Sequence, residues 1–337
     1  MAVVRLRRRH GSSHHTETLM SGNNAGSIEE TLFFNQRDVE REFSNSVSAR
    51  IRNEYPKIER VHRIGVREFR DHFVETRRPV ILSGLADWSD RRPFSLDYFA
   101  EKVGDARVLM NRYDAKPIEQ TDIRTIVNKI KQSKPDSPVH LQQWWFQEDC
   151  EALLDDLGSI EHFADDWGNK VLGFVNRTLW IGSKGAKTPL HIDTLPFNIS
   201  SVQLFGKKEW CLFNRDAFLP KKQGGEPDYQ RLLEDPATQA MSGVLEPGDI
   251  LFVPHGWWHR TETLEHSASM NSMYITEDII QPYVRGLFTM PLLMALRRDE
   301  LKELSAQHYD VTLDRLKKLA YLFGFDSEYA MDAIVNA

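Results

Sequence analysis

The segment LEPGDILFVPHGWWH, residues 245–259, decides the fold. Pro247 and Gly248 suit the two central positions of a type II turn, in which glycine supplies a positive φ angle. The four apolar residues 250–253 that follow have the length and composition of a short buried strand. This strand would deliver His259, together with the two preceding tryptophans, to the end of a β-structure.

Short β-rich runs continue on both sides of this segment, over about residues 172–276. Glycine-containing turn signals separate them, at residues 182–185, 206–207, 224–225 and 247–248. Many short strands at this spacing are typical of a β-sandwich or a jelly roll. The expected strands are 177–181, 198–205, 209–213, 243–245, 250–253 and 267–274.

The flanking residues show mixed helical and strand patterns. We expect residues 29–280 to form one unit, in which an α/β flank precedes the roll. Helices are expected at 66–73, 95–103 and 121–131, with Ser95 and Gly104 as the cap and the stop of the second helix. Strands are expected at 80–82, 107–110 and 139–146, and the charged residues 36–54 fit a solvated helix.

Both ends of the chain are expected to differ from this unit. Residues 1–28 carry a basic cluster and no acidic residue before Glu17, which favours a disordered tail. A nuclear-localisation patch and a mitochondrial presequence are the alternatives. Residues 281–337 are expected to be helical, with a kink at Pro291. The apolar side chains of residues 279–296 exceed what one exposed helix needs, so they either cover an edge of the roll or form a homodimer.

Composition restricts the class of protein. The chain has 337 residues, a formal net charge of -6, two cysteines and twelve histidines. The acidic balance disfavours a dedicated nucleic-acid binder. Two cysteines exclude a disulfide framework and a thiolate-rich zinc fold, and without a run of about 18 apolar residues no transmembrane helix is expected. We therefore expect an intracellular protein of the cytoplasm, the nucleus or both, in which imidazole and carboxylate hold any transition metal.

His191, Asp193 and His259 form the candidate metal site. Side chains at positions i and i+2 of an extended segment point to the same side, so His191 and Asp193 would project into one cavity. His259, carried by a later strand, would complete the set. Two imidazoles and one carboxylate on one octahedral face are the usual ligands of a non-haem Fe(II) that binds both oxygen and a co-substrate.

Other histidines compete with this assignment. A second His-x-Asp triplet occurs at residues 308–310, but it falls in the helical tail, where positions i and i+2 point apart. His255 lies between a proline and a glycine in an expected turn. This favours a side chain that faces solvent, or one that supports the metal ligands without binding the metal. His266 lies in a polar, exposed stretch. A lone His259 would most often be a core histidine, but three ligand types at strand positions favour a metal site.

The chain resembles the JmjC (cupin-like) family of Fe(II)- and 2-oxoglutarate-dependent oxygenases, and within it the JmjC-only members. The resemblance rests on TLWIGSKGAKTPLHID at 178–193, VQLFGKKEWCLF at 202–213 and the segment 246–259. A looser similarity extends back through RPVILSGLADW at 78–88. It covers roughly residues 66–280 and implies a double-stranded β-helix, a mainly β fold with flanking α/β elements and C-terminal helices.

The resemblance also implies cofactors and further site residues. Fe(II) and O2 would meet 2-oxoglutarate as co-substrate, with Lys208 on its distal carboxylate and Thr188 as a hydroxyl donor to the same group. Asn198 and Asn271 match asparagines that line the co-substrate site. His140 falls where several relatives carry a tyrosine that contacts the co-substrate, which is a departure from the family pattern.

The expected function is hydroxylation of a protein side chain, with conversion of 2-oxoglutarate and O2 to succinate and CO2. A lysine demethylase is an alternative, although the length leaves little room for a reader module. A second alternative is a non-catalytic scaffold associated with a chaperone partner, and a third is a cupin of other chemistry, such as an isomerase. A protein substrate is expected, and neither a membrane nor a nucleic acid is an expected partner.

Overall fold

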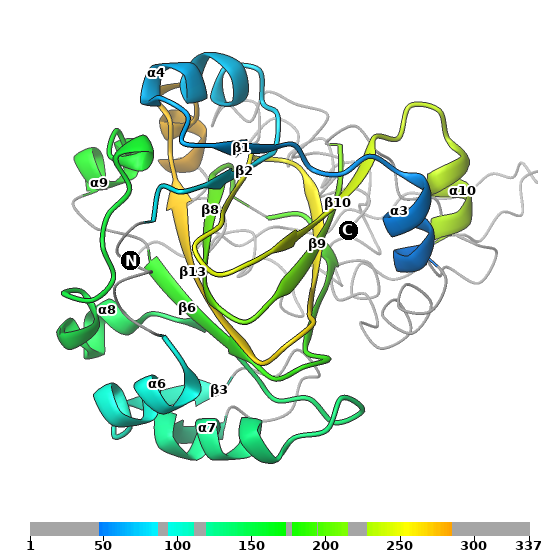
Figure 1. Cartoon of the computed structure of the whole chain (residues 1–337). Coiled ribbons are helices and arrows are strands. Elements are labelled where there is room, and N and C mark those ends of the chain that lie inside the picture. The colour runs from blue at the N-terminus through cyan, green and yellow to red at the C-terminus, as the bar shows by residue number, and fades with distance from the viewer. Residues whose placement is uncertain are drawn as a thin grey trace, which may run out of the picture.

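The computed structural model describes residues 47–86, 94–110, 119–172, 177–193, 195–214 and 228–284. The basic tail, Trp88, the kink at Pro291 and the C-terminal helices after residue 284 lie outside these ranges. No helix in the described ranges is long and apolar enough to cross a membrane. Strands occupy the centre of the molecule and helices surround them (Figure 1).

Two sheets form the body of the protein. The larger has seven strands in the order β1-β2-β11-β8-β13-β6-β5, and the smaller has four in the order β10-β9-β12-β7. All neighbouring pairs are antiparallel except β1 and β2. The larger sheet comprises β1 (Arg60–His62), β2 (Val80–Ser83), β5 (His140–Trp144), β6 (Arg177–Gly182), β8 (Asn198–Phe205), β11 (Ile250–Val253) and β13 (Ser267–Tyr274). The smaller comprises β7 (Lys187–His191), β9 (Lys208–Phe213), β10 (Ala240–Leu245) and β12 (Trp258–Thr263).

At one end of the roll, apolar side chains fill the space between the inner faces of the two sheets. Residues of β2, β8, β9 and β11 meet there, including Ile81, Ile199, Leu212 and Leu251. The other faces of these strands contribute to separate clusters, because neighbouring residues along a strand point to opposite sides. This architecture confirms the expected mainly β jelly-roll fold.

The expected turn at residues 246–249 is present and starts the strand as predicted. The Asp249 amide donates to the Glu246 carbonyl over 2.9 Å, and Gly248 has a φ of 86°. These two features define a type II turn. The β11 strand then runs through the larger sheet between β2 and β8, which places residues 254–259 at its end.

The roll extends beyond the range 172–276, because the N-terminal flank contributes β1, β2 and β5 to the larger sheet. β3 (Arg107–Met110) and β4 (Glu119–Asp122) form a separate two-stranded sheet, whose Val108 packs into the main core. The helix expected at 121–131 starts later, since residues 121 and 122 belong to β4. The Asp122 carboxylate accepts from the Thr125 amide and caps the N-terminus of the helix. The strand expected at 139–146 is shorter at both ends.

Helices cover the outer faces of the sheets. Ser95 caps α6 through the Tyr98 amide, as expected. The helix predicted at 66–73 changes into wider π-type turns after Phe69. The helical segments are α3 (Ser48–Glu54), α4 (Val66–Phe69), η2 (Arg70–Val74), α6 (Leu96–Val103), α7 (Ile123–Gln132), α8 (Phe146–Asp149), η3 (Glu151–Leu153), η4 (Glu161–Phe163), α9 (Trp167–Leu172) and α10 (Tyr229–Glu234).

The start of the C-terminal segment packs on the roll itself. Residues 277–284 are helical, and Ile279 and Tyr283 are buried beside Ile275. Part of the apolar surface noted in the sequence therefore covers an edge of the chain's own roll. The homodimer remains a prediction.

Phe69 joins the N-terminal flank to the larger sheet. Its fully buried ring contacts Phe163 and Phe252 edge to face, with ring centroids 5.4 and 5.2 Å apart. Phe69→Ala should lower the free energy of unfolding by about 3–5 kcal/mol, because a large cavity replaces a packed ring. Urea unfolding measures this loss. Leu154→Ala, at a partly exposed leucine, is the control and should stay within about 0.5 kcal/mol; equal effects of the two changes would contradict this packing.

Candidate metal centre

The smaller sheet brings the two candidate histidines together. His191 is the last residue of β7 and pairs directly with His259 near the start of β12. Directly opposed residues of antiparallel strands share one face of the sheet, so both imidazoles point the same way. Their ring centroids lie 4.1 Å apart.

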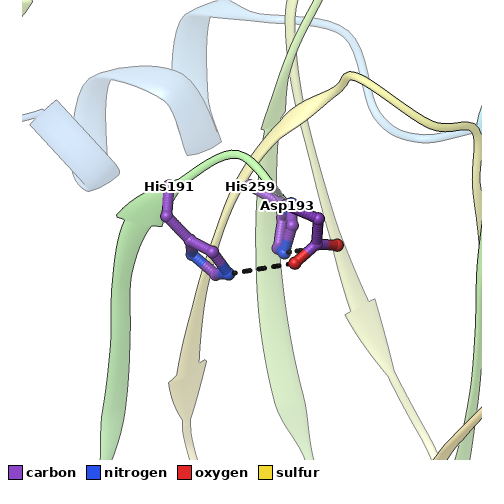
Figure 2. A group of neighbouring side chains, drawn as sticks. All are labelled: His191, Asp193 and His259. Carbon is purple, nitrogen blue, oxygen red and sulfur yellow. Dashed lines mark ion pairs between the residues drawn. The ribbon is translucent and has the colours of Figure 1, made fainter. Parts of the chain in front are cut away.

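Asp193 reaches the histidines from a loop (Figure 2). One carboxylate oxygen lies 3.8 Å from Nε2 of His191 and the other lies 3.9 Å from Nε2 of His259. The expected juxtaposition is therefore present, but its reason differs: β7 ends at His191, so the two residues do not share a strand. The loop after His191 brings the carboxylate to the side of the two rings, within reach of both Nε2 atoms (Figure 2).

His259 is held in the form that binds metals. Burial, followed by the charge of His191, lowers the pKa of His259 to about 4, against an opposing effect of Asp193 and the Trp257 carbonyl. The ring is neutral near pH 7. Its Nδ1 lies 3.1 Å from the Trp257 carbonyl oxygen, which can only accept, so Nδ1 carries the proton and the lone pair of Nε2 faces the group.

The group is open on one side. The His259 side chain is only 6% exposed, whereas those of His191 and Asp193 are 38% and 26% exposed. The ring of Trp210 stacks against His259 on the buried side. One ligand atom from each of the three residues lies within 4.8 Å of the others, and no other such group occurs in the described ranges. The arrangement suits a transition metal with open positions toward solvent.

The rival histidines do not join this group. His255 lies in the expected turn, where its backbone amide donates to the Asn198 side chain. His266 is half-buried rather than exposed, and its Nδ1 accepts from the Lys184 amide. His308 lies outside the described residues.

A β-bulge places Thr188 on the same face as His191. Thr188 pairs with Thr261 and His191 pairs with His259, so three steps along β7 oppose two steps along β12. In a regular strand, residues three positions apart point to opposite faces. The bulge instead turns Thr188 and His191 to the same face. Thr188 is buried, and its hydroxyl therefore shares the inner face of the sheet with the metal group.

Lys208 lies on this inner face, and its side chain reaches across to the larger sheet. It pairs with Thr263, which alternation places on the same face as Thr261 and His259. The side chain is buried, and Nζ donates to the Ser269 hydroxyl over 2.7 Å. Burial lowers the pKa of Lys208 to about 7. No carboxylate pairs with it among the described residues. Lys207 instead lies near the carboxylates of Glu246 and Glu265 and is partly exposed.

The interior between the two sheets is polar around Lys208. Four buried polar atoms on its walls have no hydrogen-bond partner within the described ranges: His140 Nε2, Gln203 Oε1, Trp210 Nε1 and Ser267 Oγ. Each belongs to an inward-facing position of the strand register. Buried polar groups in native proteins are nearly always satisfied. His140 Nε2, Trp210 Nε1 and Ser267 Oγ can each donate, so together with the Lys208 ammonium they fit an anionic ligand, whereas Gln203 Oε1 only accepts and needs a donor such as a water molecule. The residues present therefore fit a dicarboxylate such as 2-oxoglutarate.

The two asparagines differ in their position. Asn271 is on the inner wall, where its side-chain oxygen accepts from the Ser201 hydroxyl over 2.7 Å. Asn198 donates to the Tyr274 carbonyl and accepts from the His255 amide. These bonds use both ends of its amide on the backbone, which does not support a co-substrate role for Asn198.

His140 lies at the inner edge of the larger sheet, opposite Gly182 of β6. Burial, followed by the charge of Lys208, lowers its pKa to about 3, and the Lys187 carbonyl opposes this shift. The ring packs at a tilt against Trp180, and its Nδ1 lies 2.9 Å from the amide nitrogen of Gln142. His140 thus lies on the inner face of the sheet as a neutral imidazole.

Sequence reasoning missed several residues of this polar wall, mainly Gln142, Ser201 and Ser269. The sequence carried one usable pattern: polar residues alternate with apolar ones in SASMN at 267–271. The apolar partners Ala268 and Met270 pack in the main core, so the polar residues face the interior of the roll. Alternation in a strand normally indicates a solvated polar face, and here it indicates a polar interior of the roll.

Comparison with known proteins gives the same family. The pattern of the cupin-like domain family matches residues 66–278. "Arginine-specific demethylase JMJ22" of Arabidopsis thaliana is 24% identical over 78% of this chain and 56% of its own length. "2-oxoglutarate and iron-dependent oxygenase JMJD4" of Mus musculus is 26% identical over 56% of this chain and 52% of its own length.

"HSPB1-associated protein 1" of Bos taurus is more similar over a shorter part, 33% identical over 36% of this chain and 28% of its own length. The chain thus aligns with between about a quarter and about half of the length of these relatives. The family match spans more than half of the chain and contains the metal group, the smaller sheet and every strand of the larger sheet except β1. The protein belongs to the cupin-like JmjC domain family.

Proposed function

We propose that this protein is an Fe(II)- and 2-oxoglutarate-dependent oxygenase that hydroxylates a protein side chain. The observation that carries the proposal is the presence, on the inner face of the same sheet, of the His191–Asp193–His259 group and of a buried lysine without a carboxylate partner among the described residues. A metal site alone fits many reactions. The buried lysine adds a positive charge that can bind the dicarboxylate consumed in this reaction.

His191, Asp193 and His259 would hold the iron, which when bound supplies the activation of oxygen. The overall reaction is balanced: one oxygen atom enters succinate and the other enters the substrate C–H bond, while the keto acid loses CO2. The chain's own residues bind and orient the reactants. Lys208 and Thr188 would bind the distal carboxylate, and Trp210 excludes water behind His259.

The exposed side of the metal group supports a large substrate. His191 and Asp193 are the accessible ligands, so a side chain of a protein could reach the site without entering the roll. A demethylase is the second candidate, because relatives are named as arginine- and lysine-specific demethylases. Both reactions start with hydroxylation, and they differ in whether the product loses formaldehyde.

Mass spectrometry of candidate protein substrates separates these two reactions. With Fe(II), 2-oxoglutarate and air, we expect the substrate to gain the mass of one oxygen atom while succinate forms in equal amount. Loss of a methylene mass together with formaldehyde would support the demethylase. The scaffold alternative, suggested by a relative named for its association with HSPB1, requires 2-oxoglutarate binding without succinate even when substrates are present. An isomerase would need no site for a dicarboxylate.

A further inference from the structure

Gln142 is placed to control the hydrogen-bonding state of His140. Both residues belong to β5 and lie two positions apart, so they share the inner face of the strand. Gln142 is 5% exposed, and its amide nitrogen lies 2.9 Å from Nδ1 of His140. The next residue, Gln143, is exposed and has a φ of 54°, and the register of β5 with β6 shifts at this point.

The chemistry of this contact determines the tautomer. An amide nitrogen only donates, so Nδ1 of His140 must accept and cannot carry a proton. A doubly protonated ring is excluded as well, because burial and the charge of Lys208 lower the pKa of His140 to about 3. The ring is therefore neutral, and its one proton is on Nε2. That atom is buried and makes no hydrogen bond of good geometry among the described residues, although the Lys187 carbonyl lies close enough to the ring to oppose the fall in its pKa.

We propose that Gln142 is a positioning residue that holds His140 as a neutral Nε2–H donor beside Lys208, and that a carboxylate of the ligand accepts from both side chains. This inference rests on the proposed function for the identity of the ligand. It assigns His140 a role that needs no positive charge. A neutral donor avoids placing a second cation next to the Lys208 ammonium.

Among the described residues, no other ionisable side chain occupies the inner positions around the pair. The inner positions near Lys208 are Thr263 of β12, Ser269 of β13 and Gln203 of β8, none of which is ionisable. Glu209 follows Lys208 on the opposite face of β9, where Arg52 pairs with it. His140 and Lys208 are thus the two titratable groups at this part of the cavity in the described ranges. Ammonium and Nε2–H are both donors, and a carboxylate satisfies both.

Nitrogen-15 NMR of the histidine rings tests the tautomer without any ligand. The His140 signals are assigned by difference from His140→Phe. In the unaltered protein we expect a neutral ring with the proton on Nε2. Gln142→Glu replaces the donor with an acceptor, so His140 should leave this tautomer. Gln142→Leu should give a mixture of both neutral tautomers. Gln143→Glu, which adds the same charge at the exposed neighbour, is the matched control and should change nothing.

Two results would overturn the inference. One is an Nδ1–H or doubly protonated His140 in the unaltered protein at neutral pH, a measurement that needs no variant to fold. The other is an unchanged Nε2–H tautomer in folded Gln142→Glu and Gln142→Leu proteins, which would show that Gln142 does not control the ring.

Anaerobic calorimetry of the Fe(II)-loaded protein tests the link to the ligand. Gln142→Leu should bind 2-oxoglutarate about tenfold more weakly, because one hydrogen bond to a carboxylate is only partly available. Unchanged affinity despite a changed tautomer would contradict the role toward the ligand. Failure of the unaltered protein to bind 2-oxoglutarate would instead refute the proposed function, while the tautomer result would stand.

Discussion

His259→Ala is expected to lower 2-oxoglutarate turnover by more than about a hundredfold and to abolish stabilisation by added Fe(II). Loss of a residue that merely supports a ligand already costs about 10–100-fold in metal affinity or activity. Loss of the ligand itself leaves one imidazole and one carboxylate, both partly exposed. His259 is also the most buried member of the group, so a water molecule in its place would lack the fixed position of the ring.

The matched control is His255→Ala, four residues earlier. Its turn lies at the same rim, but His255 is not part of the metal group. Saturating metal at a hundred times its dissociation constant stabilises a protein by about 2.7 kcal/mol, which thermal unfolding under anaerobic conditions readily detects. Equal loss of this stabilisation in both variants would contradict the assignment of His259.

Lys208→Met should have opposite effects on binding and on stability. Removal of the ammonium should weaken 2-oxoglutarate binding by at least about thirtyfold, the usual cost of removing one partner of a buried charge pair. The ligand-free protein should be as stable as before or more stable, because an apolar side chain replaces a buried cation without a carboxylate partner in the described ranges. Calorimetry and urea unfolding measure the two quantities.

Lys207→Met is the control for this change. Lys207 is adjacent in sequence but points toward Glu246 and Glu265 at the surface. It should leave 2-oxoglutarate affinity unchanged. If Lys207→Met weakened binding as much as Lys208→Met, the inward position of Lys208 would not be the cause.

The pH dependence of both quantities follows from the same lysine. Its pKa is about 7 in the folded protein and 10.5 ordinarily, so the unfolded chain binds more protons between these values. The contribution of Lys208 to stability therefore rises with pH from about 7 to 10.5. Binding of 2-oxoglutarate requires the ammonium, so above pH 7 its affinity should fall by up to about tenfold per pH unit. Lys208→Arg, whose charge persists, should flatten this profile; an identical slope in both proteins would contradict it.

Sequence reasoning found the metal group because each ligand lies in a recognisable context. His259 follows a turn and an apolar strand, and His191 with Asp193 follows a proline at the end of another strand. The argument for Asp193 predicted its position beside the histidines, but for a reason that does not hold, since alternation along a strand does not apply after His191. The loop that turns the carboxylate inward has no simple sequence pattern.

The strand that carries His259 was the hardest element to predict. β12 has the sequence WHRTET, in which His259, Thr261 and Thr263 face the polar cavity. The opposite face carries Arg260 and Glu262, which form an ion pair at 3.1 Å with the arginine fully buried. Both faces are therefore polar, and neither helical nor strand periodicity of apolar residues appears. Only pairing with β9 and β7 defines this segment as a strand.

The polar wall around Lys208 also depends on long-range register. His140, Ser267 and Gln203 are more than sixty residues apart, and β5, β6, β13 and β8 align them. A sequence alone does not show which of its buried polar residues share a cavity. The resemblance to a family supplied His140, Lys208 and Thr188, whereas Gln142 and the serines followed only from the structure.

Anaerobic binding followed by admission of air tests the central claim most directly. The unaltered protein should bind Fe(II) and 2-oxoglutarate together without oxygen, and should release succinate only when air is admitted. His191→Ala and Asp193→Ala should do neither, although both should remain folded because their side chains are partly exposed. If the unaltered protein and both variants behave alike, then His191, Asp193 and His259 are not the iron site.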